Sequence, residues 1–116
     1  MGRKKETSKT SVNKNNELVS WKHPGGKFLR EGPEKCTDSE LLAILIGAGA
    51  PGRTAEQIAE EIFKTYQSFR GLANQSLEKL TKIKGLKRVK AVRIAAAFEI
   101  SRRIVKEVLK RNDPSS

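Results

Sequence analysis

A chain of 116 residues has room for one compact domain with tails, and it can bury only a modest core. Its single cysteine, Cys36, excludes a disulfide framework and a thiolate zinc site within one chain, and we expect the protein in a reducing cytoplasm. The sequence contains no apolar run long enough to span a bilayer, and its net charge of +11 favours polyanions, not membranes, as partners.

The basic residues are concentrated in two parts of the sequence. Residues 1–22 carry six basic and two acidic side chains, and residues 76–112 carry twelve basic and three acidic ones. Residues 23–75 are nearly neutral, with six basic and seven acidic side chains. A surface that only kept the protein in solution would not be so uneven, so this distribution favours a binding surface in the last third. A solvated basic face without a partner is the alternative.

The first twenty residues are polar and without periodicity, which predicts a disordered basic tail over 1–20. A domain is expected over 21–111, followed by a short tail at 112–116. At the start of the domain, the glycine- and proline-rich stretch 21–32 is expected to pack through three apolar side chains, Trp21, Phe28 and Leu29.

Two capping boxes mark the starts of helices in the middle of the chain. Thr37 and Thr54 are each followed three residues later by Glu or Gln, the arrangement in which side chains and backbone amides bond each other reciprocally. Apolar residues recur at helical spacing behind both boxes. These signals predict helices near 38–46 and 55–66.

Two further helices follow. Ser76 can cap a helix near 77–82, Gly85 then breaks the chain, and a long helix is predicted from residue 88 to between about 108 and 111. The first half of this long helix is apolar nearly all round, as expected of a central buried helix. No segment alternates between apolar and polar residues with a period of two, so the fold class is predicted to be all-α, a small helical bundle.

Residues 47–52 (GAGAPG) match the glycine pattern of a dinucleotide-binding turn, G-x-G-x-x-G. The preceding apolar run, however, is capped like a helix, and no second strand is present to complete a βαβ unit. About twenty residues further on, where an acidic ribose ligand is required, the sequence reads SFRG at 68–71. We therefore interpret 47–52 as a glycine-rich connection between helices and expect no cofactor.

Residues 76–103 are similar to the helix-hairpin-helix of many DNA-repair and replication proteins. Ile83 and Leu86 stand where apolar residues tuck the hairpin between its helices, with Gly85 at the turn. A hairpin directly before a helix presents unpaired backbone N–H groups near the positive end of the helix dipole, and a glycine lets that backbone approach an anion. Members of this class usually carry a second glycine in the hairpin, where this sequence has Lys87.

We predict a phosphate-binding site at this hairpin. Lysine and arginine side chains surround the turn, and such contacts hold the nucleic-acid backbone without reading bases, so binding should not depend on the DNA sequence. The predicted DNA-binding residues are Lys84, Gly85, Leu86, Lys87, Arg88 and Lys90. The alternative is a hairpin that only packs helices, because the second glycine is missing.

Several motifs occur in the order found in the N-terminal domain of the bacterial RadC family, which the chain resembles over residues 28–103. They are FLREGP at 28–33, SELLAILIGAG at 39–49, AEEIF at 59–63, FRGL at 69–72 and the hairpin itself. The resemblance implies that 38–66 form a second, degenerate helix-hairpin-helix packed against the first. This second unit offers a candidate second DNA contact at Gly49, Gly52, Arg53 and Thr54.

Full-length members of the RadC family continue into a JAB/MPN-type domain that resembles a zinc metallopeptidase and needs paired histidines, an aspartate and a glutamate. This sequence has one histidine, His23, which we interpret as a loop residue that binds no metal. We therefore expect an isolated N-terminal module that is not an enzyme. Cys36 is expected to be a small buried or half-buried thiol, not a nucleophile.

Together these features predict a DNA-binding module that contacts phosphates without sequence preference, and the resemblance implies a link to DNA repair. The alternative function is a protein-interaction or regulatory module whose apolar helical surface docks the absent C-terminal domain or a repair protein. Salt-dependent DNA binding by the domain would separate the two.

Overall fold

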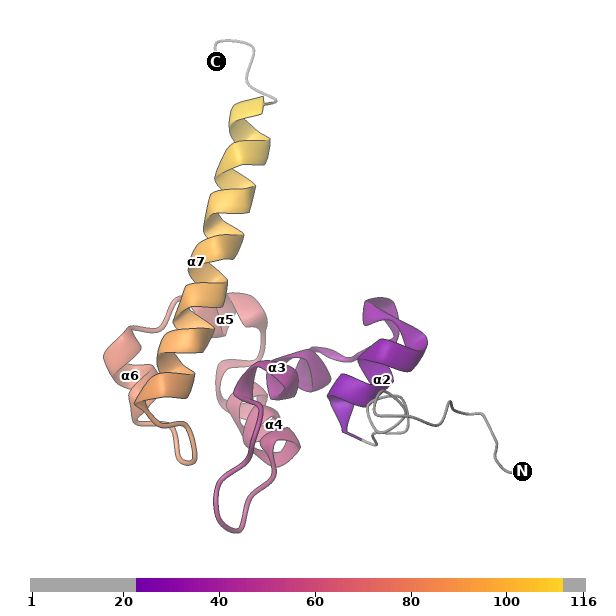
Figure 1. Cartoon of the computed structure of the whole chain (residues 1–116). Coiled ribbons are helices and arrows are strands. Elements are labelled where there is room, and N and C mark those ends of the chain that lie inside the picture. Colours follow the sequence, from indigo (N-terminus) through magenta and orange to yellow (C-terminus); the bar gives the residue numbers. More distant parts are fainter. Residues whose placement is uncertain (1–22, 112–116) are drawn as a thin grey trace, which may run out of the picture.

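Residues 23–111 are described by the computed structural model shown in Figure 1. The predicted tails at 1–20 and 112–116, and the packing predicted for Trp21, lie outside these residues. The described chain contains helices and no strand, so the all-α prediction is confirmed, and none of its helices is both long and apolar enough to cross a membrane. In chain order the elements are α2 (Pro24–Glu31), a 3-10 helix η1 (Pro33–Lys35), α3 (Asp38–Ile46), α4 (Ala55–Tyr66), α5 (Phe69–Ala73), α6 (Leu77–Thr81) and α7 (Arg88–Arg111).

Both predicted capping boxes are present, and they fix the first residues of α3 and α4. The Thr37 hydroxyl accepts a hydrogen bond from the Glu40 amide at 3.1 Å, and the Glu40 carboxylate accepts one from the Thr37 amide at 2.8 Å. Thr54 and Gln57 repeat this arrangement at 3.0 and 2.9 Å. Serine hydroxyls cap α5 and α6 in a simpler way, each accepting one amide of the first turn.

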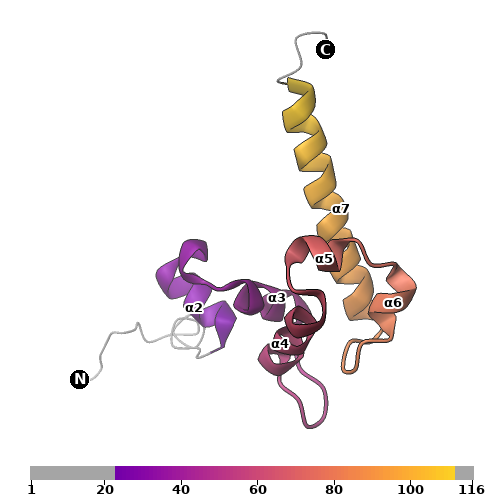
Figure 2. The same ribbon diagram turned by 180° about the vertical axis from the view of Figure 1, so that it is seen from behind.

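The core joins the middle of the chain to the start of α7. Helix α3 packs against α4 and α7, and α6 packs against α7. Figure 2, which views the molecule from behind, shows the short helices α5 and α6 beside the base of α7. Burial of each large apolar side chain contributes about 1.5–3 kcal/mol. The largest fully buried side chains are Leu42, Ile46, Ile58, Ile62, Leu72, Leu80, Leu86 and Ile94.

The glycine- and proline-rich stretch at the start of the domain forms a helix, α2, that the sequence pattern does not predict. His23 precedes its first turn, and Pro24 occupies a first-turn position, where its fixed φ suits a helix start. Phe28 and Leu29 are 39% and 58% exposed, so the prediction that the chain packs through these side chains is wrong. Pro24 and Gly26 are the buried residues of this helix instead.

Helix α7 is less buried than the sequence predicts. It runs to Arg111, as predicted, and Figure 1 shows its second half standing clear of the other helices. Its buried residues are Ala91 and Ile94, whereas Val89 is 69% and Val92 47% exposed. The prediction of a central buried helix is therefore wrong. Helix α7 lies at the edge of the core, because the neighbouring helices cover only one of its faces.

The capping box of α4 can be tested by mutation. Thr54→Ala removes the hydroxyl that accepts the Gln57 amide, and we expect a loss of about 1 kcal/mol in the free energy of unfolding. Thr65→Ala is a matched control, because Thr65 is exposed near the end of the same helix, and its effect should stay within about 0.5 kcal/mol. Urea unfolding followed by circular dichroism measures both variants, and equal losses would contradict the capping role.

Candidate nucleic-acid interface

Two turns of the same kind connect α3 to α4 and α6 to α7. In the second connection, the Leu86 amide donates to the Ile83 carbonyl oxygen at 2.9 Å, and Gly85, the third residue of the turn, has a φ of +86°. In the first connection, residues 50–53 form the equivalent turn, closed by two backbone bonds of 2.9 Å, with a φ of +79° at Gly52. A positive φ at the third position is the geometry that favours glycine. The first glycine-rich segment is thus a connection between helices, as predicted.

Gly85 allows the second connection to pack closely against α4. A Cβ on this residue would lie 2.8 Å from Cδ1 of Ile58, closer than real Cβ contacts come. The missing Cβ therefore faces the core and not an approaching anion, which corrects the reason that the sequence pattern suggests for this glycine. The neighbouring Leu86 is 1% exposed and its amide is bonded inside the turn. Leu86 thus anchors the connection and offers a ligand neither its side chain nor its N–H group.

The start of α7 differs from the starts of the four α-helices directly before it, although α2 also begins without a side-chain cap. Helices α3, α4, α5 and α6 each follow a serine or threonine whose hydroxyl accepts an amide of the first turn. Lys87, which precedes α7, has no acceptor on its side chain, and its carbonyl oxygen accepts from the Ala91 amide at 2.9 Å. Within the described residues, the amides of Arg88, Val89 and Lys90 have no acceptor. Such N–H groups at the positive end of a helix bind anions.

Three basic residues stand at or within four positions of these open amides in the sequence. Lys84, Lys87 and Arg88 are all exposed, and in the part of the chain that the structure describes none of them forms an ion pair or a hydrogen bond. A phosphate at the start of α7 would therefore meet backbone N–H donors and positive side chains together. Hydrogen bonds between charged groups are about twice as strong as those between neutral groups.

Lys90, the last of the predicted contacts, is used inside the protein. Its ammonium group donates to the carbonyl oxygen of Ala48 and, at 3.5 Å, to that of Gly49 in the first connection. The half-buried side chain thus ties the first turn of α7 to a residue 42 positions earlier in the sequence. No local pattern indicates this role, because the partner is a backbone carbonyl that only the folded domain brings near.

The first connection, which holds the candidate second DNA contact, satisfies its own polar groups. Thr54 caps α4, and the Arg53 guanidinium donates to the Glu61 carboxylate, which lowers the pKa of Glu61. Gly49 is required by packing, because a Cβ there would overlap the Arg53 carbonyl oxygen, whereas a Cβ on Gly52 would meet nothing within 4 Å. The four predicted residues come together, but the Arg53 and Thr54 side chains already have partners within the chain.

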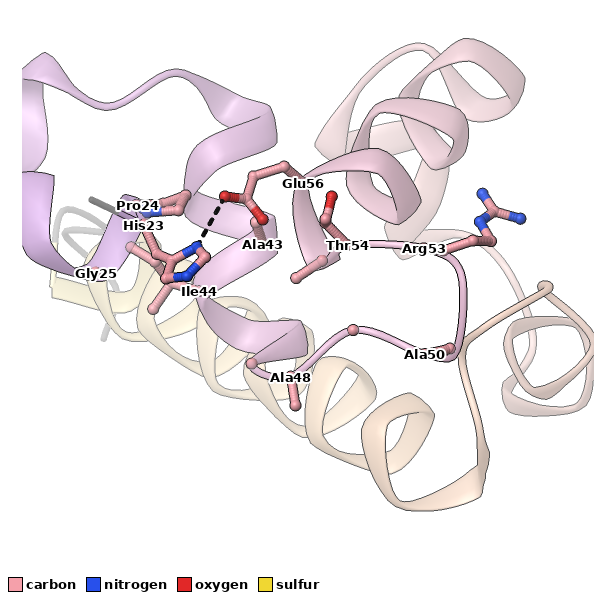
Figure 3. A pocket seen from close by; sticks show the side chains of 13 residues that line it. His23, Pro24, Gly25, Ala43, Ile44, Ala48, Ala50, Arg53, Thr54 and Glu56 are labelled. Carbon is pink, nitrogen blue, oxygen red and sulfur yellow. Dashed lines mark hydrogen bonds and ion pairs between the residues drawn. The ribbon is translucent and has the colours of Figure 1, made fainter. Parts of the chain in front are cut away.

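A groove that the sequence does not predict lies between α2, the end of α3 and the start of α4 (Figure 3). It has a volume of about 730 Å³, and its walls are mostly small apolar residues. At one wall the His23 Nδ1 lies 3.3 Å from a carboxylate oxygen of Glu56. His23 is the N-cap residue just before α2, outside the helix as interpreted, and its ring contacts α4. Residues 23–111 contain no group of three or more His, Cys, Asp or Glu side chains placed to hold a metal ion.

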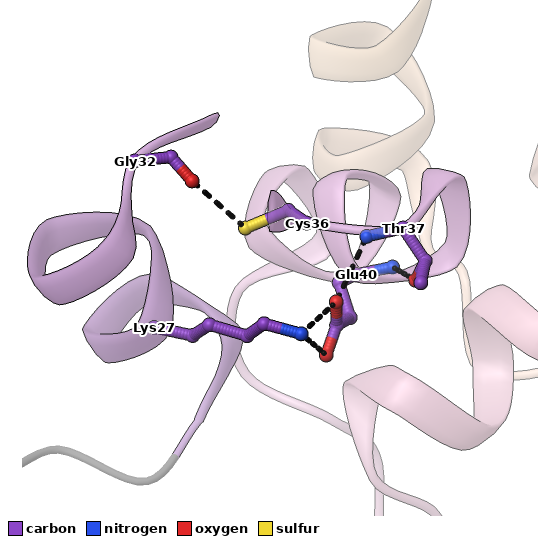
Figure 4. A network of polar contacts seen from close by, with 5 residues as sticks. All are labelled: Lys27, Gly32, Cys36, Thr37 and Glu40. Atoms are coloured by element: carbon purple, nitrogen blue, oxygen red, sulfur yellow. Dashed lines mark hydrogen bonds and ion pairs between the residues drawn. The ribbon is translucent and has the colours of Figure 1, made fainter. Parts of the chain in front are cut away.

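A polar contact fastens α2, one wall of this groove, to α3 (Figure 4). The Lys27 ammonium donates to both carboxylate oxygens of Glu40, at 3.0 and 3.2 Å. The hydrogen bond from the Thr37 amide and the bond from Lys27 together lower the pKa of the Glu40 carboxyl. Cys36 lies nearby, half-buried as predicted, with its thiol 3.9 Å from the Gly32 carbonyl oxygen.

Comparison with known proteins gives the chain a family. The family model described as UPF0758 N-terminal matches residues 16–92, which include both connections and the start of α7. The chain belongs to the UPF0758 family. This match confirms the resemblance to the N-terminal domain of the RadC family.

Three UPF0758 proteins illustrate the similarity. The protein of Geobacillus thermodenitrificans is 40% identical over 81 residues, which are 70% of this chain and 36% of that protein. Those of Coprothermobacter proteolyticus and Pseudoalteromonas atlantica are each 37% identical, over 89 and 98 residues, which are 77% and 82% of this chain and 38% and 44% of those proteins. The chain thus spans about two fifths of the length of these relatives. No solved structure matches it.

Because Gly85 packs against Ile58 and Gly52 has no neighbour, a glycine-to-alanine substitution should destabilise the two turns of this UPF0758 domain unequally. Gly52→Ala should cost about 1–2 kcal/mol of unfolding free energy, because alanine is strained at a positive φ but meets no neighbour there. Gly85→Ala should cost about 1–3 kcal/mol more, because its Cβ overlaps Ile58. Ile58→Val removes Cδ1 and should reduce that extra cost. Urea titrations of the single and double variants measure these losses. Equal losses at the two glycines would contradict the close packing of Gly85 against Ile58.

Proposed function

We propose that this chain is a DNA-binding module that holds phosphate groups at the start of α7 without reading the base sequence. The observation that carries the proposal is the contrast between the two connections. The first is closed by its own side chains, whereas the second leaves three amides and three basic side chains without a hydrogen bond or ion pair in the described chain. A phosphate group, with several acceptor oxygens and a negative charge, matches both kinds of donor.

The charge distribution favours a polyanion over a small anion. Residues 76–112 carry twelve basic and three acidic side chains, far more positive charge than one phosphate could engage. A chain of phosphates can meet many of these side chains and release counterions as it binds. The likeness of the hairpin to those of repair and replication proteins points to the same class of ligand, and it is the ground for proposing a role in DNA repair.

The aromatic side chains of α4, α5 and α7 favour a duplex over a single strand as the ligand. Single strands are held largely by bases that stack on exposed aromatic rings. In α4, α5 and α7 the rings pack on one another instead, with centroids 5.1 Å apart for Phe63 and Phe69 and 6.4 Å apart for Phe69 and Phe98. We therefore propose the phosphate backbone of duplex DNA as the ligand, and binding without catalysis as the role of this chain.

A second candidate function, that of a protein-interaction module, is favoured by one specific observation. Seven of the eleven exposed large apolar side chains in the described residues belong to α7. Contiguous apolar surface on a small protein marks interaction sites. Five of the seven lie in the second half of α7, away from the open amides at its start, so the two functions are compatible.

Lys87 and Arg88 provide the sharpest test of the proposed site. With about three phosphates neutralised by Lys84, Lys87 and Arg88, a plot of log affinity for a duplex against log salt should have a slope near −2.7. Changing Lys87 and Arg88 together to alanine should reduce that slope by about 1.8 and weaken binding to all sequences alike. Both side chains are exposed, so each change should alter the unfolding free energy by less than about 0.5 kcal/mol.

Lys106→Ala combined with Lys110→Ala removes the same charge at the far end of α7 and is the matched control. This variant should keep a slope close to that of the unmodified chain. Fluorescence anisotropy of a labelled duplex at several salt concentrations measures all three proteins. If the Lys87/Arg88 variant keeps the affinity and the slope of the unmodified chain, the start of α7 is not the DNA site.

A further inference from the structure

The groove between α2, the end of α3 and the start of α4 opens beside the first residues that the structure describes. His23, Pro24 and Gly25 line it on the side of α2 (Figure 3). Residue 22 is therefore joined to the chain at the edge of this groove. The residues just before it can reach the groove, because each residue of extended chain spans about 3.5 Å.

The walls of the groove suit a large, flat apolar side chain. Seven of its thirteen lining residues are glycine or alanine, which leave room for a ring to lie against the backbone. Ile44 is the largest apolar side chain among them, and it is 37% exposed. The volume of about 730 Å³ is that of a pocket that encloses a ligand, and covering its apolar surface is favourable.

The seven residues that precede His23 carry apolar side chains that could cover this surface. They read NELVSWK at 16–22, and Leu18, Val19 and Trp21 stand out from the mostly polar sequence before them. The UPF0758 N-terminal model begins its match at residue 16, so the family's domain includes these seven residues. Trp21 is the single tryptophan of the chain and is two positions from the groove wall at His23.

We propose that the Trp21 side chain occupies this groove, with the residues before α2 folded back over the end of α3. The Cα atom of Trp21 is at most about 7 Å from that of His23, so the indole reaches the groove without moving α2. The ring covers Ile44 and Ala48. A buried tryptophan usually needs an acceptor for its N–H group, and the Glu56 carboxylate at the wall offers one.

An occupant from the same chain has an advantage over any separate molecule. The link of two residues holds the ring beside the groove, so its effective concentration is high and does not depend on dilution. The docked ring also packs on the first connection, where the Ala48 carbonyl oxygen accepts the Lys90 ammonium of α7. The residues before α2 thus support the same connection that Lys90 fastens to α7.

Fluorescence of Trp21 in the complete chain tests the proposal, because no other tryptophan contributes to the signal. The reference is a synthetic peptide of residues 16–22, in which the indole is in water. The chain should emit at a shorter wavelength than the peptide, and its acrylamide quenching constant should be several-fold lower. Both values should stay the same when the protein is diluted.

Ile44→Gln replaces the exposed apolar side chain of the groove by a polar one and should shift emission and quenching toward those of the peptide. Leu77→Gln is the matched control, because Leu77 is 45% exposed in α6 and does not line the groove. The control should leave the fluorescence unchanged. Circular dichroism of both variants checks that the helices persist.

Trp21→Ala gives a second measurement, which does not use fluorescence. This variant should unfold at a lower urea concentration, because it uncovers the groove. Ile44→Gln should lower the urea midpoint less in the Trp21→Ala background than in the unmodified chain, because the effects of two side chains in contact do not add. Leu77→Gln and Trp21→Ala should have additive effects.

Three results would contradict the proposal. The first is emission and quenching in the complete chain equal to those of the peptide. The second is a protected ring that Ile44→Gln and Leu77→Gln affect equally, because Trp21 would then be buried elsewhere. The third is protection that disappears on dilution, because the groove would then hold the Trp21 of a second copy.

Discussion

Because Gly85 has no Cβ, the turn before α7 rests directly on Ile58 of α4, at a separation where any side chain on residue 85 would overlap it. The buried Leu86 side chain and the bond from the Lys90 ammonium to the first connection complete this joint. Helix α7 begins immediately after it. The direction of α7, and the direction in which its first amides point, are therefore set by packing in the core. The proposed DNA site depends on that joint.

The two connections share a turn geometry and differ in how the following helix starts. At the first, Thr54 caps α4 and Arg53 is paired with Glu61, so the polar groups are satisfied locally. At the second, a lysine stands where a serine or threonine would contribute about 1 kcal/mol as a cap. Lys87 therefore costs the helix start some stability. Such a residue is expected to be kept for function and not for folding.

Local signals in the sequence predict the local structure well. The capping boxes can be read directly, because their partners are three residues apart. Helix α2 is not predicted, because the glycines at 25 and 26 have low helix propensity, although Pro24 is a usable signal for a helix start. The partner of Lys90 cannot be predicted, because Ala48 comes near only in the folded domain. Periodicity finds α7 but not its exposure, since it describes the pattern on one helix and not the neighbours that cover it.

The open start of α7 is tested most directly by replacing Lys87 with serine and with alanine. Both substitutions remove the same charge, but the serine hydroxyl can cap α7, which should make that variant about 1 kcal/mol more stable than the alanine variant. If phosphate occupies the first amides of α7, the serine variant should bind a duplex more weakly, because its hydroxyl competes for the same N–H groups. Equal duplex affinities of the two variants, together with the expected difference in stability, would contradict the account.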